Sequence, residues 1–227
     1  MPTLVFWIDV DNTLLAFDDV KKDLDKHLQV ELGPQLTERF WDIYEQVRKE
    51  RGVVDIPLAL SRLREETPLT EMDDEIYRHI HSIFDNYPYY EALYPDALKT
   101  LEYLRTIGLT VIVSDGDLFY QSTKIINSNL AEAVNGRVLL YVHKQDHLDE
   151  MVKLYPADHY ALIDDKPGIL ADVKAALEDK LTTVFVRQGK YAASPLPEGF
   201  TPDITVEHIA DLLHYSAEQF FQTHSSR

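Results

Sequence analysis

The sequence predicts an α/β fold in which a doubly wound parallel sheet carries an inserted all-helical domain after its first strand. Three observations support this prediction. An apolar run over residues 4–10 opens the chain, residues 18–92 then show apolar side chains only at helical spacing, and from Tyr94 onward apolar runs alternate with helical patterns. Continuous apolar strands that alternate with helices are typical of a parallel sheet covered on both faces.

The pattern of apolar residues in the insert predicts a small bundle of helices. Its clearest helix follows Pro34, a residue that suits the first turn of a helix, and ends before Gly52. Further helices are expected over residues 20–32, 57–66 and 71–85. Helices of this length can bury their apolar faces against one another.

The remaining chain alternates between strands and helices. Strands are expected over residues 110–113, 137–142, 159–163 and 182–186. Helices are expected over residues 95–107, 118–127 and 148–154 and after Pro167. The proline-rich segment 194–202 predicts a surface loop before a last strand and helix. The first strand is most simply a member of the same sheet, so we expect a core domain of residues 1–17 and 93–227 and a cap domain of residues 18–92.

The composition limits the class of protein. The 22 Lys and Arg against 39 Asp and Glu leave a formal net charge of −17, which repels nucleic-acid backbones and anionic membrane surfaces, so we expect neither as a partner. The chain has no cysteine, which excludes disulfides, thiol nucleophiles and Cys-ligated metal sites. No basic region precedes the first apolar run, and no apolar segment approaches the ~18 residues that span a bilayer. We therefore expect a cytoplasmic protein.

Acidic residues follow three of the predicted strands. They are Asp9 and Asp11 after the first strand, Asp115 after the second, and Asp164 and Asp165 after a later one. The carboxyl ends of parallel strands form one edge of the sheet, so these carboxylates should converge. Like charges held close together are costly unless a cation compensates them, and oxygen ligands suit Mg²⁺. A single Asp after a strand is more often a cap, as we expect for Asp117, but three acidic strand ends favour a divalent metal site.

Four motifs resemble those of the haloacid dehalogenase-like (HAD) superfamily of hydrolases. FWIDVDNTLL matches the Asp-x-Asp-x-Thr motif, VIVSDG looks like the strand that ends in Ser or Thr, and ALIDDKPGIL looks like the acidic pair of the fourth motif. The third motif is a lysine well before that pair, and Lys144 stands at a suitable distance. The helical insert lies where the family places a C1 cap, so the resemblance covers nearly the whole chain.

The resemblance implies Mg²⁺-dependent hydrolysis of a phosphate monoester through an aspartyl-phosphate intermediate. Asp9 would be the nucleophile and Asp11 the general acid and base. The metal would be held by Asp9, the backbone carbonyl of Asp11 and Asp165, while Asp164 would ligate it or orient the ligands. The phosphoryl group would be bound by Thr13, Ser114, the Asp115 amide and Lys144.

Three positions depart from the family pattern. Asn12 stands where many relatives have glycine, a change that asparagine tolerates because it accepts unusual backbone angles. Asp115 stands where many relatives have asparagine, so its carboxylate should point toward the metal or into the following turn. Lys144 lacks the proline that commonly follows the family's lysine, so Lys124 and Lys153 are rival assignments, and Lys144 is preferred.

Asp11 separates the reactions of the superfamily. Dehalogenases and phosphonate hydrolases typically replace this residue, so its presence favours hydrolysis of phosphate esters over removal of halide. A phosphomutase shares every motif and is the second candidate, and a non-catalytic phospho-ligand-binding regulator is a third. The expected partner is a small phosphorylated metabolite. Arg39, Arg48 and Arg51 are possible anion contacts, although a solvated helix face accounts for them more simply; monomer and homodimer both stay open.

The insert is expected to act as a lid. Two chain crossings, at residues 16–18 and 90–94, would let it close over the carboxyl edge of the sheet, exclude water and place its side chains against the leaving group. The segment 87–95, rich in tyrosine and proline, is expected to be a packed hinge rather than a ligand site.

Overall fold

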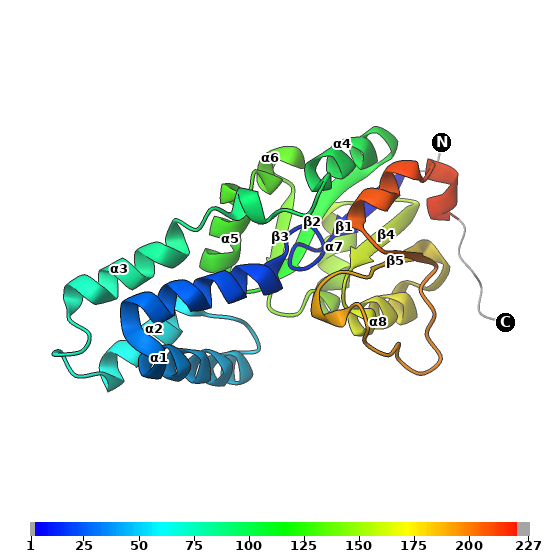
Figure 1. Cartoon of the computed structure of the whole chain (residues 1–227). Coiled ribbons are helices and arrows are strands. Elements are labelled where there is room, and N and C mark those ends of the chain that lie inside the picture. Colours follow the sequence, from blue (N-terminus) through cyan, green and yellow to red (C-terminus); the bar gives the residue numbers. More distant parts are fainter. Residues whose placement is uncertain (1–2, 222–227) are drawn as a thin grey trace.

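The computed structural model describes residues 3–221, and its centre is a sheet of six strands whose neighbours all run parallel. The strands are β1 (Leu4–Ile8), β2 (Leu109–Asp115), β3 (Val138–Tyr141), β4 (His159–Asp164), β5 (Leu181–Val186) and β6 (Ile204–Val206). Their order in the sheet is β3-β2-β1-β4-β5-β6, which places β1 between β2 and β4 (Figure 1). The fold is the predicted doubly wound α/β fold.

Helices cover both faces of the sheet. In β1, Phe6 and Ile8 belong to one apolar cluster and Val5 and Trp7 to another, because successive side chains of a strand point to opposite faces. The first face is covered by α4 (Ala97–Ile107), α5 (Leu118–Asn127), the short α6 (Leu130–Ala133) and the C-terminal 3₁₀ helices Ile209–His214 and Ala217–Phe221. The second face is covered by α7 (Leu148–Leu154) and α8 (Pro167–Leu177).

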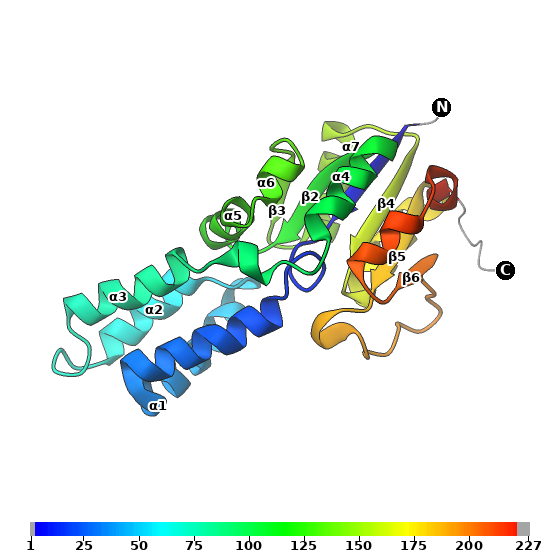
Figure 2. The ribbon, with the colours of Figure 1, turned by 45° about the horizontal axis from the view of Figure 1, so that its top comes forward.

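The insert between β1 and β2 is helical. It contains α1 (Phe17–Arg51), α2 (Ile56–Glu66), α3 (Asp74–Asp85) and the 3₁₀ helix Tyr89–Ala92. The ribbon of α1 is interrupted at Gly33, whose φ of 73° and ψ of 168° are not helical, and Pro34 opens its second half. The predicted break before Pro34 is therefore present. The helices α1, α2 and α3 extend as an arm beyond the sheet (Figure 2).

Two details differ from the sequence prediction. The expected helix after the last strand is replaced by two 3₁₀ helices, and α6 was not predicted. The division into core and cap domains stays a prediction, and its residues 1–2 and 222–227 lie outside the described part of the chain. None of the described helices is long and apolar enough to cross a membrane.

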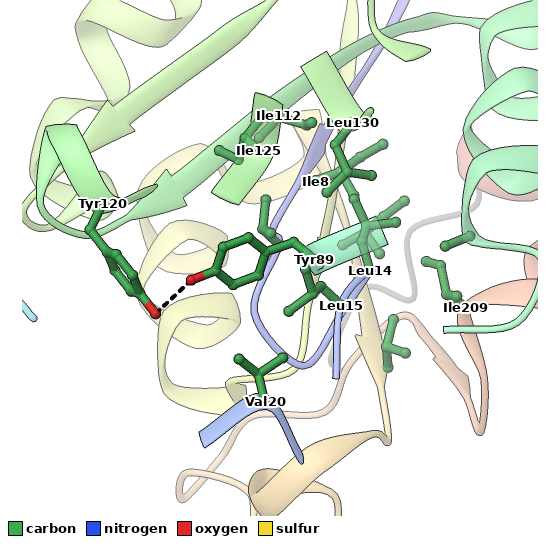
Figure 3. Packing of buried hydrophobic residues seen from close by; sticks show 14 of the residues in the cluster. Ile8, Leu14, Leu15, Val20, Tyr89, Ile112, Tyr120, Ile125, Leu130 and Ile209 are labelled. Atoms are coloured by element: carbon green, nitrogen blue, oxygen red, sulfur yellow. Dashed lines mark hydrogen bonds between the residues drawn. The ribbon is translucent and has the colours of Figure 1, made fainter. Parts of the chain in front are cut away.

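The two connections between insert and sheet run side by side and are joined by backbone hydrogen bonds. The Ala16 amide donates to the carbonyl of Ala92 at 2.8 Å, and the Tyr94 amide donates to the carbonyl of Leu14 at 2.9 Å. Tyr89 is fully buried in the apolar cluster of β1, and its hydroxyl donates to that of Tyr120 at 3.0 Å (Figure 3). This part of the aromatic return segment is packed, as predicted for a hinge.

Candidate active site

The carboxyl ends of the central strands border a cavity of about 230 Å³ beneath the insert. Asp11 and Asp115 line it from the sheet, and Tyr44 and Arg48 line it from α1. The insert therefore lies at the carboxyl edge of the sheet, as the sequence predicted. Its closure and its pivots stay predictions.

A tight turn after β1 shapes one wall of the site. The amides of the three residues 13–15 all donate to the carbonyl of Val10. Asn12 has a φ of 60°, in the left-handed region, which confirms the predicted tolerance of asparagine there. Gly189, beyond β5, approaches so closely that a Cβ atom on it would lie 2.4 Å from the Asn12 side chain. A glycine at 189 is therefore required by both its close neighbour and its own positive φ of 63°.

Three buried carboxylates form a cluster at the ends of β1 and β4. Asp9, Asp164 and Asp165 each place an oxygen within 4.8 Å of the others. Within the described residues, Oδ2 of Asp9 and both oxygens of Asp165 are buried without a hydrogen-bond partner. Burial and the nearby charges of Asp164 and Asp9 raise the pKa of Asp165 to about 9. Hard oxygen donors that lack partners fit a divalent cation such as Mg²⁺, so these residues are suited to hold one.

Lys144 lies inside this cluster and is almost fully buried. Its Nζ donates to Oδ1 of Asp9 at 2.7 Å and lies 2.6 Å from Oδ2 of Asp164. Burial lowers the pKa of Lys144, but the carboxylates of Asp164 and Asp9 outweigh it and raise the pKa well above its usual range. Lys153, one of its rivals, is exposed on α7. Of the three candidate lysines, Lys144 is the one that contacts Asp9.

Asp115 differs from its expected orientation. Its Oδ1 accepts a hydrogen bond from the backbone amide of Lys144 at 2.8 Å, and the acidic cluster does not include it. The carboxylate points neither to the cluster nor into its own following turn, and it fixes the loop that carries Lys144. Asp117, by contrast, caps α5 as predicted, because its Oδ1 accepts from the amides of Phe119 and Tyr120.

Two buried hydroxyls can donate to a phosphoryl group. Thr13 Oγ1 has no hydrogen-bond partner within the described residues. Ser114 Oγ accepts from Nε2 of Gln121 at 2.7 Å, which leaves the serine's own proton free to be donated. Gln121 was not predicted, because nothing in the sequence shows which face of α5 meets the site.

Asp11 lies apart from the acidic cluster and has its own lysine. Lys124, on α5, donates to both of its oxygens, at 2.6 and 2.8 Å. The predicted role of the Asp11 side chain is acid–base chemistry, and only its backbone carbonyl was expected to ligate a metal. Lys166 was missed, although it directly follows the acidic pair. Burial lowers the pKa of Lys166, but the charges of Asp9, Asp164 and Asp165 raise it well above its usual range.

In the described structure, Arg48 is the one of the three arginines considered as anion contacts that lines the cavity. It pairs with Glu45 at 2.8 Å. Arg39 instead pairs with a glutamate on α2, and Arg51 pairs with the aspartate that caps α2. These two belong to the surface of the insert.

Comparisons with known proteins place these features in context. No family model matches the sequence, and no curated protein matches it. A protein from Burkholderia xenovorans assigned to the haloacid dehalogenase-like hydrolases is 42% identical, with a TM-score of 0.87 over 96% of this chain and 99% of that chain. The L-2-haloacid dehalogenase of Xanthobacter autotrophicus (15% identity, TM-score 0.61, 94% and 98% covered) shares the fold. So does a HAD-hydrolase of Bacillus subtilis bound to magnesium (14% identity, TM-score 0.62, 94% and 98% covered).

Proposed function

Because the chain belongs to the haloacid dehalogenase-like hydrolases, we propose that it hydrolyses small phosphate monoesters in a Mg²⁺-dependent reaction. The observation that carries this proposal is the buried cluster of Asp9, Asp164 and Asp165, in which three oxygens lack partners. A carboxylate that attacks a phosphate monoester faces a second anion and needs a cation between them. A carboxylate that displaces halide from carbon meets no such anion at the reacting atom.

The proposed reaction has two steps, and each breaks one bond to phosphorus. An oxygen of Asp9 attacks phosphorus, the bond to the ester oxygen breaks, and Asp11 gives its proton to that oxygen, which leaves as an alcohol. Water then attacks the aspartyl phosphate and loses a proton to Asp11. The bond between phosphorus and Asp9 breaks, inorganic phosphate is released, and the Asp9 carboxylate and the proton on Asp11 are restored.

The remaining residues of the site hold charge and direct hydrogen bonds. When bound, Mg²⁺ would neutralise charge between the phosphate and the carboxylates of Asp9 and Asp165. Lys144, charged and in contact with Asp9, orients the nucleophile. The hydroxyls of Thr13 and Ser114 supply donors for the equatorial oxygens of the phosphoryl group.

The position of Asp11 supports a reaction in which the leaving group is an oxygen. It lines the cavity that α1 covers, so a proton on it can reach a substrate there. The cavity of about 230 Å³ is smaller than the ~300–1,000 Å³ of most ligand pockets, and it carries cations from the insert, Lys21 and Arg48, beside Glu45. These features support a small, polar phosphate ester as substrate.

The test is phosphate release from a panel of phosphorylated metabolites, with Mg²⁺ and with chelator. We expect activity that chelation abolishes and that Asp9→Asn abolishes in Mg²⁺, because an amide cannot form an acyl phosphate. Asp172→Asn, an exposed substitution on α8, serves as the matched control and should retain activity. Release of halide from 2-haloacids without metal, and no phosphate release from the panel, would overturn the proposal.

A further inference from the structure

Lys124 is a second buried lysine of the site, and the reaction described above gives it no role. Only 1% of its surface is exposed. Its Nζ donates to both oxygens of Asp11, and the same atom lies 4.0 Å from the centre of the Phe17 ring. A lysine is rarely buried to this extent unless a partner compensates its charge, and Asp11 is that partner.

The two buried lysines serve different carboxylates. Lys144 contacts Asp9 and Asp164, whereas Lys124 contacts Asp11. In the described part of the chain, no side chain other than Lys124 donates a hydrogen bond to the Asp11 carboxylate. The Asp11 side chain is 22% exposed, so without this contact it would be free to turn about its side-chain torsions.

Lys124 is itself held on a fixed helix. The N-terminus of α5 is capped by Asp117. One turn before Lys124, Tyr120 accepts a hydrogen bond from the buried Tyr89 hydroxyl (Figure 3). The Tyr120 ring also lies 5.3 Å from the lysine Nζ. Because the helix is fixed, Lys124 can hold the Asp11 carboxylate in one defined position.

We propose that Lys124 is a positioning residue that holds the Asp11 carboxylate at the wall of the cavity, facing the leaving group of the substrate. The geometry favours this over a purely structural ion pair, because Asp11, Lys124, Phe17 and Tyr120 all line the cavity. An ion pair with a purely structural role would be expected behind the residues that line the cavity, not among them. The inference rests on the proposed function, in which Asp11 gives a proton to the departing oxygen.

The effect of the Asp11 position on catalysis depends on the leaving group. An alkyl phosphate leaves as a basic alkoxide and needs the proton, whereas p-nitrophenyl phosphate leaves as a stable phenolate and needs it far less. A poorly placed Asp11 should therefore harm the alkyl ester more. The ratio of kcat/KM for glycerol 2-phosphate to that for p-nitrophenyl phosphate isolates this effect, since kcat/KM reports on the steps up to departure of the leaving group.

The experiment measures that ratio in the full-length protein with Mg²⁺. Lys124→Met should lower it at least about tenfold, and by no more than the ~10²–10⁴-fold that general acid catalysis contributes. Lys174→Met is the matched control, because Lys174 is a largely buried lysine paired with Asp203 at 3.0 Å, outside the site. It should keep the wild-type ratio. If Lys124→Met is too unstable, Lys124→Gln keeps an uncharged amide donor on a shorter side chain, and its ratio should fall in the same direction.

A double-mutant cycle with Asp11→Asn separates positioning from general damage. If Lys124 acts through Asp11, adding Lys124→Met to Asp11→Asn should lower kcat/KM for the alkyl ester no further. Equal losses on the two esters in Lys124→Met, or additive losses in the cycle, would overturn the inference.

A crystal structure of Lys124→Met decides the matter without an activity measurement. The Asp11 carboxylate should leave its place at the cavity wall or adopt several conformers. An unchanged, single conformer would refute the positioning role. If wild-type protein releases phosphate from no ester of the panel, the proposed function fails, while this structure still tests the contact between Lys124 and Asp11.

Discussion

Asp165→Asn should stabilise the metal-free protein. The pKa of Asp165 rises from its ordinary value of 3.8 to about 9, chiefly because of burial and then because of Asp164 and Asp9. At pH 7 the carboxyl is ionised in the unfolded chain but holds its proton in the folded one. At 1.36 kcal/mol per pH unit between 3.8 and 7, taking up that proton costs about 4 kcal/mol. A domain typically has only ~5–15 kcal/mol of stability.

The sign follows from the raised pKa of an acid. Its stabilising contribution is complete below pH 3.8 and is lost progressively as the pH rises toward 9. An amide does not ionise, so in chelator at pH 7 the variant should exceed wild type by up to about 4 kcal/mol, or by about 10 °C in Tm for a chain of this size. Mg²⁺ should then stabilise wild type, by about 2.7 kcal/mol at 100 times its Kd, and should stabilise the variant far less.

The assay is urea unfolding of wild type and Asp165→Asn, each in chelator and in Mg²⁺, at several pH values. Asp172→Asn, on the exposed face of α8, controls for the loss of one negative charge and should match wild type under both conditions. Two results would show that the buried carboxylate is compensated in another way. Either wild type and Asp165→Asn have the same free energy of unfolding in chelator, or Mg²⁺ stabilises both proteins equally.

Lys144→Met should abolish phosphate release while Lys153→Met retains it, and the reverse result would move the third motif. Burial lowers the pKa of His159 below 6.5, so its contribution to stability is complete above pH 6.5 and is lost as the pH falls. His159→Gln should therefore flatten the urea-unfolding profile below pH 6.5, by up to about 1.4 kcal/mol per pH unit, and an unchanged slope would contradict this. Gly108→Ala should lower the free energy of unfolding by roughly 1–3 kcal/mol, because its Cβ would lie 2.7 Å from a buried phenylalanine ring. Gly168→Ala is the control, because its Cβ would have no atom within 4 Å, and it should not destabilise the protein. Equal midpoints of urea unfolding for the two variants would contradict the predicted contact.

The sheet and the acidic cluster could be predicted because topology alone determines them. Every residue that directly follows a strand of a parallel sheet reaches the same edge, so the apolar runs before Asp9 and Asp164 were enough to bring these carboxylates together. The break of the long helix was equally local, because Gly33 and Pro34 together end one helix and begin the next.

The contacts made by α5 could not be predicted, because part of its packing departs from the usual pattern of hydrophobicity. Leu118, Phe119 and Ile126 are 60–66% exposed, while the polar Gln121 and Lys124 are buried. Periodicity would turn the apolar side chains inward and leave this lysine in solvent. What buries it is a carboxylate on a distant loop, and one sequence does not show that partner. The orientation of Asp115 depends in the same way on the backbone of a loop that follows β3.

The charges of the site indicate where a metal would be held. Lys144 compensates Asp9 and Asp164 by direct contact, and Lys124 compensates Asp11. The positive charge of Lys166 acts on Asp165, yet neither oxygen of that carboxylate has a hydrogen-bond partner in the described structure, and its pKa stays high. In the described structure Asp165 therefore has no direct cationic partner, at a point bordered by the proposed nucleophile. A divalent ion placed there would both relieve the cost of burying Asp165 and lie beside the proposed nucleophile, so under the proposed function the stability of the fold and the reactivity of the site would depend on the same ion.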